Sequence, residues 1–329
     1  MKNFSYVRAT SVKEAVQQAS IPQSMFIAGG TNLVDRMKVF LDEPSQLIDI
    51  TRLDMTRIEQ TKDGLRLGAL VSNTAVADHP EVRRSYPMLA RAILLGASQQ
   101  IRNVATTGGN LLQRTRCPYY YDTAFDCNKR EPGSGCAALT GINRIHALFG
   151  ASDQCVAVHP SDMCVPLAAL DAIVEVEGSK GKRQIPFTDF HRLPGNTPQR
   201  DTNLEPGELI TALILPPAPF AKSSVYLKLR DRASYAFALV SVAAAVELAD
   251  SRIKTARLAM GGMAHKPWRF TEAETFLIGK AANTETFQQA AEIALKGAKP
   301  LEYNGFKVEL AKRAIRRALT VSAKGGGIA

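Results

Sequence analysis

Ile27-Ala28-Gly29-Gly30-Thr31-Asn32 places two adjacent glycines between a short apolar run and a helical pattern, and Thr106-Thr107-Gly108-Gly109-Asn110 repeats that arrangement. Adjacent glycines allow positive φ angles and a close approach of the backbone to a ligand. The start of the following helix offers free N–H groups to a phosphate. A plain tight turn with a helix cap explains either segment alone, but the pair is suited to the two phosphates of one pyrophosphate. Neither segment matches GxGxxG, so a Rossmann dinucleotide fold is not indicated.

The pattern around these glycines predicts an α+β chain with a break near residue 217. A small α/β unit, with strands at 25–28 and 47–50, closes near residue 55. The next elements expected are strands at 65–70, 172–176, 183–185 and 208–215, and helices at 88–97 and 165–170. Prolines 216, 217 and 219 form a stiff boundary. The elements expected beyond it are strands at 224–229, 236–248 and 254–260, then helices at 272–278, 286–296 and 305–318.

The composition excludes several classes of protein. The chain has 329 residues and a net charge of +10, but no run of five basic residues, so nucleic acid binding is not favoured. No apolar stretch reaches the roughly 20 residues that a membrane-spanning helix needs. The first residues contain no apolar core of a secretory signal.

All five cysteines lie within or just after one stretch, at about 115–158. This stretch has little periodicity and is predicted to be a loop insertion. Cys117, Cys127, Cys136 and Cys155 have neither the paired spacing of structural zinc sites nor the compact spacing of ferredoxins. Basic residues flank them and would balance the negative charge of a [4Fe–4S] cluster with four thiolates. From the residues alone, free thiols or a disulfide, an iron–sulfur cluster and zinc all stay open. Cys164 starts an apolar helical pattern and is expected to be a buried thiol, although it rivals Cys155 as a fourth ligand.

Three other groups of residues have a functional and a structural interpretation. His159, His191 and His265 share no metal-binding spacing, and we expect surface or core histidines. Tyr119 to Tyr121 are expected to pack over a cluster, against a cofactor or in an ordinary core. Arg230, Asp231 and Arg232 are expected to face a cofactor, a partner subunit or solvent.

Three segments together resemble one protein family. They are AGGTNLVDRMK (28–38), QQIRNVATTGGNLLQ (99–113) and LRDRASYAFALVSVAAAVE (229–247). The family is the FAD-binding medium subunit of the molybdenum hydroxylases, the group of xanthine dehydrogenase and aldehyde oxidoreductase. The insertion LLQRTRCPYYYDTAFDCNKREPGSGCAAL (111–139) is similar to that of the FAD subunits of heterotrimeric periplasmic aldehyde oxidoreductases, which carry an additional [4Fe–4S] cluster; most members of the family lack it.

The resemblance implies a fold, domain limits and site residues. The fold is a two-lobed FAD-binding domain of the vanillyl-alcohol-oxidase (PCMH) type at 1–218, with lobes at about 1–55 and 56–218 and an iron–sulfur insert at about 115–158. A CO dehydrogenase flavoprotein C-terminal domain follows at 222–325. The implied flavin contacts are Phe26, Ile27, Ala28, Gly29, Gly30, Thr31, Asn32, Leu33, Val34, Thr106, Thr107, Gly108, Gly109, Asn110, Asp162, Ile210 and Lys228. The implied cluster ligands are Cys117, Cys127, Cys136 and Cys155.

The resemblance also implies an electron-transfer subunit without a catalytic residue of its own. A molybdenum-cofactor large subunit would oxidise an aldehyde to a carboxylic acid with water, and electrons would pass through a [2Fe–2S] small subunit and FAD to an external acceptor. Export to the periplasm with a signal-bearing partner is expected, and a cytoplasmic complex is the alternative. A stand-alone FAD-dependent oxidoreductase and a zinc-stabilised binding module are the rival functions.

Overall fold

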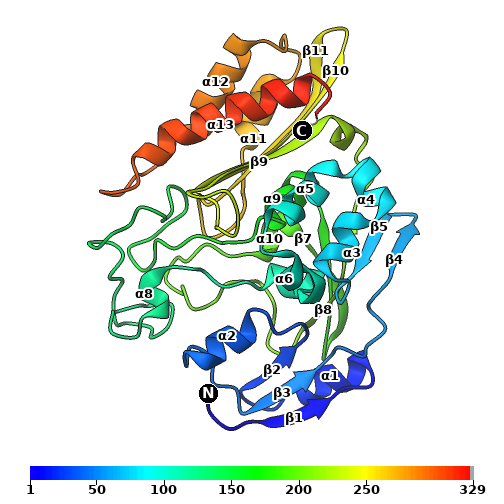
Figure 1. The fold of residues 1–329 in the computed structure, drawn as a ribbon, viewed down its shortest axis with the longest axis vertical. Helices are drawn as coiled ribbons and strands as arrows, with labels where there is room; N and C mark the ends of the chain where they lie inside the picture. The colour runs from blue at the N-terminus through cyan, green and yellow to red at the C-terminus, as the bar shows by residue number, and fades with distance from the viewer. Residues whose placement is uncertain (327–329) are drawn as a thin grey trace.

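Three β-sheets organise the chain in the computed structural model, which describes residues 1–326 (Figure 1). A small parallel sheet, a central five-stranded sheet and a C-terminal four-stranded sheet follow one another along the long axis of the molecule. The expected α+β architecture is therefore confirmed. No helix among residues 1–326 is long and apolar enough to cross a membrane.

The small sheet has the strand order β1-β3-β2, and all its strands are parallel. Parallel neighbours need a crossover connection, and a helix supplies each one here. All four residues of the central strand β3 are buried. The elements of this unit are β1 (Ser5–Arg8), α1 (Val12–Gln18), β2 (Ser24–Ile27), α2 (Leu33–Lys38) and β3 (Gln46–Asp49).

The central sheet is antiparallel, with the order β4-β5-β8-β6-β7. Its strands are β4 (Ile58–Thr61), β5 (Gly64–Gly68), β6 (Ile173–Gly178), β7 (Gly181–Pro186) and β8 (Leu209–Leu215). Strand β8 pairs with β5 on one side and β6 on the other, so the segment between β5 and β6 leaves the sheet and returns. That excursion carries the second glycine segment and all five cysteines.

Short helices fill the excursion, because prolines and capping side chains interrupt it repeatedly. Ser72, Ser98 and Thr106 each accept a hydrogen bond from a backbone N–H of the following helix. The helices here are α3 (Asn73–Asp78), α4 (Pro80–Ser85), α5 (Pro87–Leu95), α6 (Gln99–Val104), α7 (Thr107–Leu111), α8 (Pro118–Tyr121) and α9 (Cys164–Ala169), and α10 (Phe187–Phe190) follows β7. Only α8 interrupts the turns of residues 115–158, which agrees with a loop insertion.

The C-terminal sheet is antiparallel with the order β12-β11-β10-β9, and its helices cover one face (Figure 1). Its apolar core is separate from that of the central sheet. The elements are η1 (Pro219–Ser223), β9 (Ser224–Leu229), β10 (Val240–Ala249), β11 (Arg252–Gly261), β12 (Trp268–Arg269), α11 (Thr271–Leu277), α12 (Thr284–Leu295) and α13 (Phe306–Ala323).

The first glycine segment lies directly against the end of α6. A Cβ atom at Gly29 would lie 2.1 Å from the carbonyl oxygen of Val104. Gly30 has a φ of +69°, which favours glycine. The small unit therefore reaches the central region through a contact between two backbones.

We predict that Gly29→Ala destabilises the chain by about 1–3 kcal/mol, because the added methyl group overpacks against backbone that has to move. Urea denaturation of the wild type and the variant measures the free energy of unfolding. Gly305→Ala is the matched control, since a Cβ there meets no atom within 4 Å. A Gly29→Ala variant as stable as the wild type would contradict this packing.

Candidate functional site

A cavity of about 970 Å³ lies where the three sheets meet. Residues from β2 and α2 form one wall, and residues from α6 and α7 form a second wall. Residues 158–163 and 204–210 close the central side, and residues 228–241 close the C-terminal side. The volume is at the upper end of the range for small-molecule and cofactor sites, which is about 300–1,000 Å³.

Most of the expected flavin contacts line this one cavity. The lining includes Phe26, Ile27, Ala28, Gly29, Gly30, Thr31, Asn32, Leu33, Thr106, Gly108, Gly109, Asn110, Asp162, Ile210 and Lys228. Val34 and Thr107 are not among the lining residues. Val34 packs against Gly30, and the buried hydroxyl of Thr107 donates to the carbonyl of Val71 at 2.9 Å.

The second glycine segment differs from the expected turn, since Gly108 and Gly109 lie inside α7. The helix starts early because the Thr106 hydroxyl caps it by accepting a hydrogen bond from the N–H of Gly109 at 3.2 Å. Neither glycine has a positive φ. A Cβ at Gly109 would approach only the Thr106 hydroxyl, at 2.8 Å, so the absence of a side chain keeps the cavity open there.

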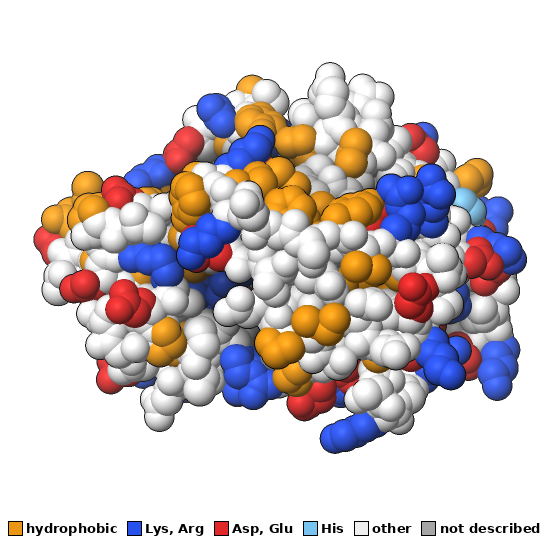
Figure 2. Space-filling view, turned by 90° about the horizontal axis from the view of Figure 1, so that it is seen from below, with side chains coloured by type: hydrophobic (Ala, Val, Ile, Leu, Met, Phe, Trp, Pro, Cys, Tyr) orange, Lys and Arg blue, Asp and Glu red, His pale blue; other side chains and the backbone are white. Residues whose placement is uncertain are grey.

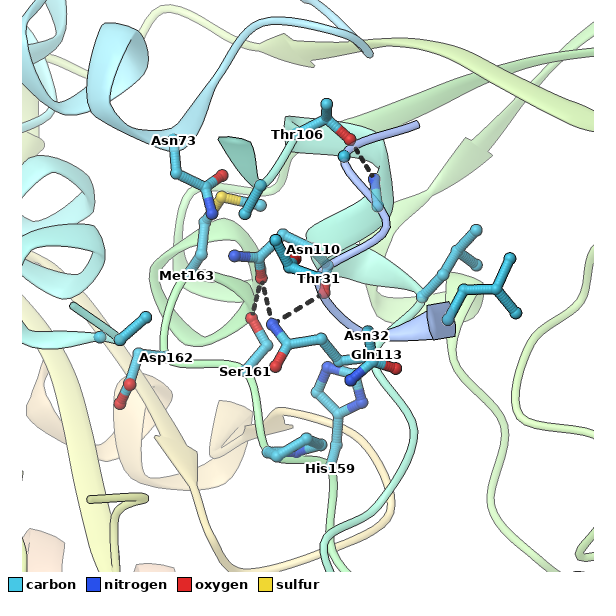
Figure 3. A pocket seen from close by; sticks show the side chains of 18 of the residues that line it. Thr31, Asn32, Asn73, Thr106, Asn110, Gln113, His159, Ser161, Asp162 and Met163 are labelled. Carbon is cyan, nitrogen blue, oxygen red and sulfur yellow. Dashed lines mark hydrogen bonds between the residues drawn. The ribbon is translucent and has the colours of Figure 1, made fainter. Parts of the chain in front are cut away.

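Polar side chains bridge the segments around the cavity (Figure 3). The Asn110 Oδ1 atom accepts hydrogen bonds from the Ser161 hydroxyl at 2.5 Å and from the Gln113 amide at 2.9 Å. The Asp162 carboxylate accepts from Lys228 Nζ at 2.8 Å and from the Tyr226 hydroxyl at 2.6 Å. Burial raises the pKa of Asp162, and the charge of Lys228 opposes that shift. The hydrogen bonds of Asp162 to Lys228 and Tyr226 join the central region to the C-terminal sheet.

Five buried polar atoms in the cavity wall have no hydrogen-bond partner among the described residues: Asn32 Nδ2, Asn73 Oδ1, Arg116 Nε, His146 Nδ1 and His159 Nε2. Buried polar groups normally have a partner. The donors and acceptors of a polar cofactor would supply these partners. Together with the open backbone at the glycines, the wall fits FAD.

A second, smaller core holds four cysteines. Cys117, Cys127 and Cys155 are buried in it together with Tyr120, and Cys136 packs against its edge. Tyr119 and Tyr121 pack against the same core. The tyrosine triplet therefore packs in the core that also holds the cysteines.

An acidic residue fastens the insert to the rest of the domain. The buried Lys129 ammonium lies 2.5 Å from a carboxylate oxygen of Asp201, and Arg114 Nε lies 2.7 Å from the other. These two cations hold the pKa of Asp201 well below its usual range, although its burial acts in the opposite direction. No sequence pattern indicated this clamp, because Asp201 follows the insert by many residues and lies in no motif.

Two histidines contact cysteine sulfurs in this core. His146 Nε2 lies 3.1 Å from Cys117 Sγ, and His265 Nε2 lies 3.3 Å from Cys155 Sγ. Burial lowers the pKa of His146 to about 4 and that of His265 to about 3, so both imidazoles are neutral. Burial also raises the pKa of the Cys117 thiol to about 11, whereas a hydrogen bond from Cys155 lowers the pKa of Cys136 to about 6.

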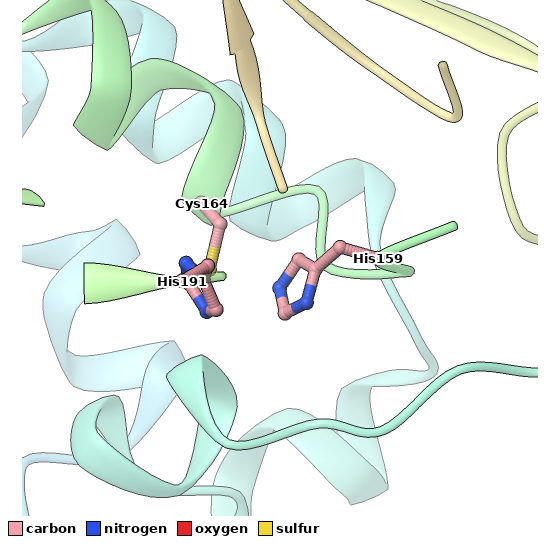
Figure 4. A group of neighbouring side chains, drawn as sticks. All are labelled: His159, Cys164 and His191. Atoms are coloured by element: carbon pink, nitrogen blue, oxygen red, sulfur yellow. The ribbon is translucent and has the colours of Figure 1, made fainter. Parts of the chain in front are cut away.

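The structure brings His159 and His191 together with Cys164, a grouping that their spacing in the sequence did not indicate (Figure 4). Their potential ligand atoms lie within 4.8 Å of one another. The His191 Nε2 atom hydrogen-bonds to the carbonyl of Leu111 at 2.8 Å, and the two imidazole rings are 4.2 Å apart. Burial raises the pKa of Cys164 to about 12, so the thiol keeps its proton. The trio is a neutral packing group behind α7, and Cys164 belongs to the main core rather than to the cysteine core.

The fold and the cavity define a flavin-binding oxidoreductase subunit. The sequence profile of the FAD binding domain in molybdopterin dehydrogenase matches residues 2–218, and that of the CO dehydrogenase flavoprotein C-terminal domain matches residues 225–321. The chain belongs to the family of FAD-binding medium subunits of the molybdenum hydroxylases, as the sequence predicted.

Relatives of known function and solved structures agree with this family. The aldehyde oxidoreductase FAD-binding subunit PaoB of Escherichia coli K12 is 51% identical over 97% of this chain and 98% of its own length. The glyceraldehyde dehydrogenase medium chain of Sulfolobus acidocaldarius is 29% identical over 88% of this chain and 85% of its own length. A chain of quinoline 2-oxidoreductase from Pseudomonas putida 86 superposes with a TM-score of 0.76 at 26% identity and covers 99% of both chains.

Several cavity residues were missed or left undecided by the sequence. Asn73 lies in no motif, and Gln113 ends the 99–113 segment but was not among the expected contacts; the structure places both in the wall. Asp231 and Arg232 line the cavity, whereas Arg230 donates to the carbonyl of Leu95 at 3.1 Å. The presence of Ser161 in the wall was foreseeable, because it precedes Asp162 directly.

We predict that Asp201→Asn destabilises the chain by about 3 kcal/mol, because it leaves the buried Lys129 ammonium without its counter-charge. The stabilisation by Asp201 should also fade as the pH falls below about 4, since its pKa is lower in the folded chain than in the unfolded chain. Urea denaturation at neutral and acidic pH measures both effects. Glu309→Gln, which breaks the exposed pair with Lys312, should cost less than about 1 kcal/mol. Equal losses in the two variants would contradict the clamp.

Proposed function

We propose that this chain is the FAD-binding electron-transfer subunit of a molybdenum-dependent aldehyde oxidoreductase, and that it carries an additional [4Fe–4S] cluster. The 51% identity to an aldehyde oxidoreductase subunit supports the substrate class. The FAD-binding profile and the cavity support the flavin. Bound FAD supplies reversible redox chemistry, and the chain positions it and excludes water.

The observation that carries this proposal is a shared wall. Cys117 and His146 belong to the cysteine core and are also among the residues that line the flavin cavity. A cofactor in the cavity and a cluster held by the cysteines would therefore be neighbours. Such an arrangement suits the transfer of electrons between two centres on one chain.

The donor set of the cysteine core favours an iron–sulfur cluster over zinc. Four thiolates on one zinc ion have sulfur atoms about 4 Å apart, given Zn–S bonds of about 2.3 Å. Within residues 1–326, the side chains grouped closely enough to hold a single metal ion are His159, Cys164 and His191, and none of the four cysteines is in such a group. The core also holds the buried cation Lys129, which opposes the negative charge of the thiolates. The residues thus fit a cofactor larger than a single ion.

A multisubunit complex agrees with the surface of the chain. Figure 2 looks at the molecule from the side of the β1–β3 unit and shows hydrophobic side chains exposed among basic ones. The exposed hydrophobic residues of this unit include Tyr6, Ile21, Val39 and Phe40. Exposed apolar side chains of this kind are typical of partner interfaces when they gather in patches.

The partners we propose are a molybdenum-cofactor large subunit and a [2Fe–2S] small subunit, with an external electron acceptor. The large subunit would oxidise the aldehyde, with water supplying the oxygen atom of the acid. We further propose periplasmic export with a signal-bearing partner. We also propose that domains 1–218 and 222–325 meet at the prolines between β8 and β9.

We predict that Gly109→Val abolishes FAD retention, because its side chain meets Thr106 and intrudes where the flavin backbone contact would be. The flavin content per chain, measured by absorbance after release of the cofactor from the complex, tests this. Gly305→Val is the control, since that glycine is not among the residues that line the cavity and a Cβ there meets no atom within 4 Å. Full flavin content in the Gly109→Val complex would contradict the assignment of the segment around Gly109 to FAD binding. A wild-type complex without flavin would contradict the proposed function.

We predict that Cys127→Ser and Cys155→Ser lose the iron and labile sulfide of this chain's cluster, beyond what the [2Fe–2S] subunit contributes, but keep FAD, whereas Cys164→Ser keeps all three. The reason is that Cys164 belongs to a different core from the other four cysteines. Iron, sulfide and flavin analysis of the co-produced complex gives the three contents. Loss of iron in Cys164→Ser with retention in Cys155→Ser would reverse the ligand assignment.

A further inference from the structure

Two buried imidazoles approach the cysteine core from different parts of the chain. His146 lies on the insert itself, two residues before Leu148, and His265 lies in the loop between β11 and β12. Each directs Nε2 at a cysteine sulfur, at 3.1 Å for Cys117 and 3.3 Å for Cys155. These distances are within hydrogen-bond range for a sulfur acceptor.

The surroundings of the two rings favour one proton arrangement. The Nδ1 atoms of His146 and His265 are buried and have no hydrogen-bond partner. A neutral imidazole carries one N–H, and the other nitrogen keeps only a lone pair. With the proton on Nε2, the sulfur accepts it and no buried N–H is left without an acceptor. A metal-bound thiolate has no proton to donate, so this tautomer is also the one that a cluster requires.

We propose that His146 and His265 are positioning residues that donate Nε2–H to two cluster-binding thiolates and raise the reduction potential of the cluster. The inference rests on the proposed [4Fe–4S] cluster. Hydrogen bonds to the ligand sulfurs withdraw negative charge, which stabilises the reduced state most. Groups that hold metal ligands from behind set both their orientation and the properties of the metal.

The frame around His146 shows why its ring is fixed. The fully buried Lys307 donates from α13 to the carbonyl of His146 at 2.8 Å, and the Asn304 amide donates to it at 3.3 Å. The N–H of His146 donates to the carbonyl of Asn143 at 3.1 Å. The backbone of the histidine is thus held on both sides, by Lys307 of the C-terminal helix and by Asn304 just before that helix.

The loop that carries His265 is held by the insert in turn. The N–H groups of Leu148 and Phe149 donate to the carbonyl of Met263, at 2.8 Å and 3.0 Å. The N–H of His159 donates to the carbonyl of Ala264 at 2.9 Å. The C-terminal domain therefore presents His265 to Cys155 through a loop that the cysteine-bearing segment itself fixes. Both histidines depend on the docking of this domain.

The test is a redox titration of the co-produced complex, with the cluster followed by electron paramagnetic resonance. His146→Phe and His265→Phe keep a ring but remove the donor, and His146→Gln and His265→Gln keep an amide N–H. His79→Phe is the control, because His79 lies between α3 and α4, away from the cysteine core. Iron, sulfide and flavin contents are measured on every variant.

We expect each phenylalanine variant to keep four irons and FAD, and to lower the reduction equilibrium constant of the cluster about tenfold, which is about 59 mV for one electron. The glutamine variants and His79→Phe should stay close to the wild-type potential. Loss of iron in a phenylalanine variant with retention in the matching glutamine variant would also support a positioning donor.

Two results would overturn the inference alone. One is a wild-type potential in both phenylalanine variants that retain the cluster. The other is loss of iron in both the phenylalanine and the glutamine variants of one histidine, which would make that histidine a ligand. A wild-type complex with FAD whose iron is fully accounted for by the [2Fe–2S] subunit would instead overturn the proposed cluster, and this inference with it.

Discussion

The contact between Gly29 and the carbonyl oxygen of Val104 is the constraint on which the cavity depends. No side chain fits between these two backbones, so the turn after β2 lies directly against the end of α6. That contact places the first glycine segment beside Thr106 and α7, although they are far apart in the sequence. The cavity is the space that remains between the two segments once the C-terminal sheet closes over it. The glycines therefore shape the site mainly because they let two backbone segments of the chain lie directly against each other.

Local sequence patterns predicted most of the strands and the longer helices, because each depends on neighbouring residues, but the short strands β1, β4 and β12 were not expected. The start of α7 was misplaced, since Thr106 caps the helix before the glycines rather than after them. The grouping of His159, Cys164 and His191 was not foreseeable. The grouping depends on the path of the chain, which comes back to the cavity after β6, β7 and α10. The spacing of residues in the sequence does not predict such a path.

The clamp at Asp201 illustrates the same limit for charged residues. The basic residues of the insert were identifiable, and their partner was expected to be the thiolates. Lys129 and Arg114 instead share one carboxylate, which satisfies both buried cations. The charge of Lys129 still acts on the cysteine core, where it lowers the pKa of Cys155 against the stronger effects of burial and of Cys136. One cation thus contributes to folding and to the electrostatics of the site.

In the cysteine core, different residues supply the positive charge and the hydrogen-bond donors. Lysine and arginine supply the positive charge, whereas His146 and His265 supply N–H groups without adding charge, because burial lowers their pKa far below neutrality. A charged donor at either position would also carry a large cost of desolvation. Neutral donors can therefore be placed directly on the sulfurs of a buried core. Since His146 and Cys117 also stand at the wall of the flavin cavity, a change in the polarity of this core would act on both redox sites together.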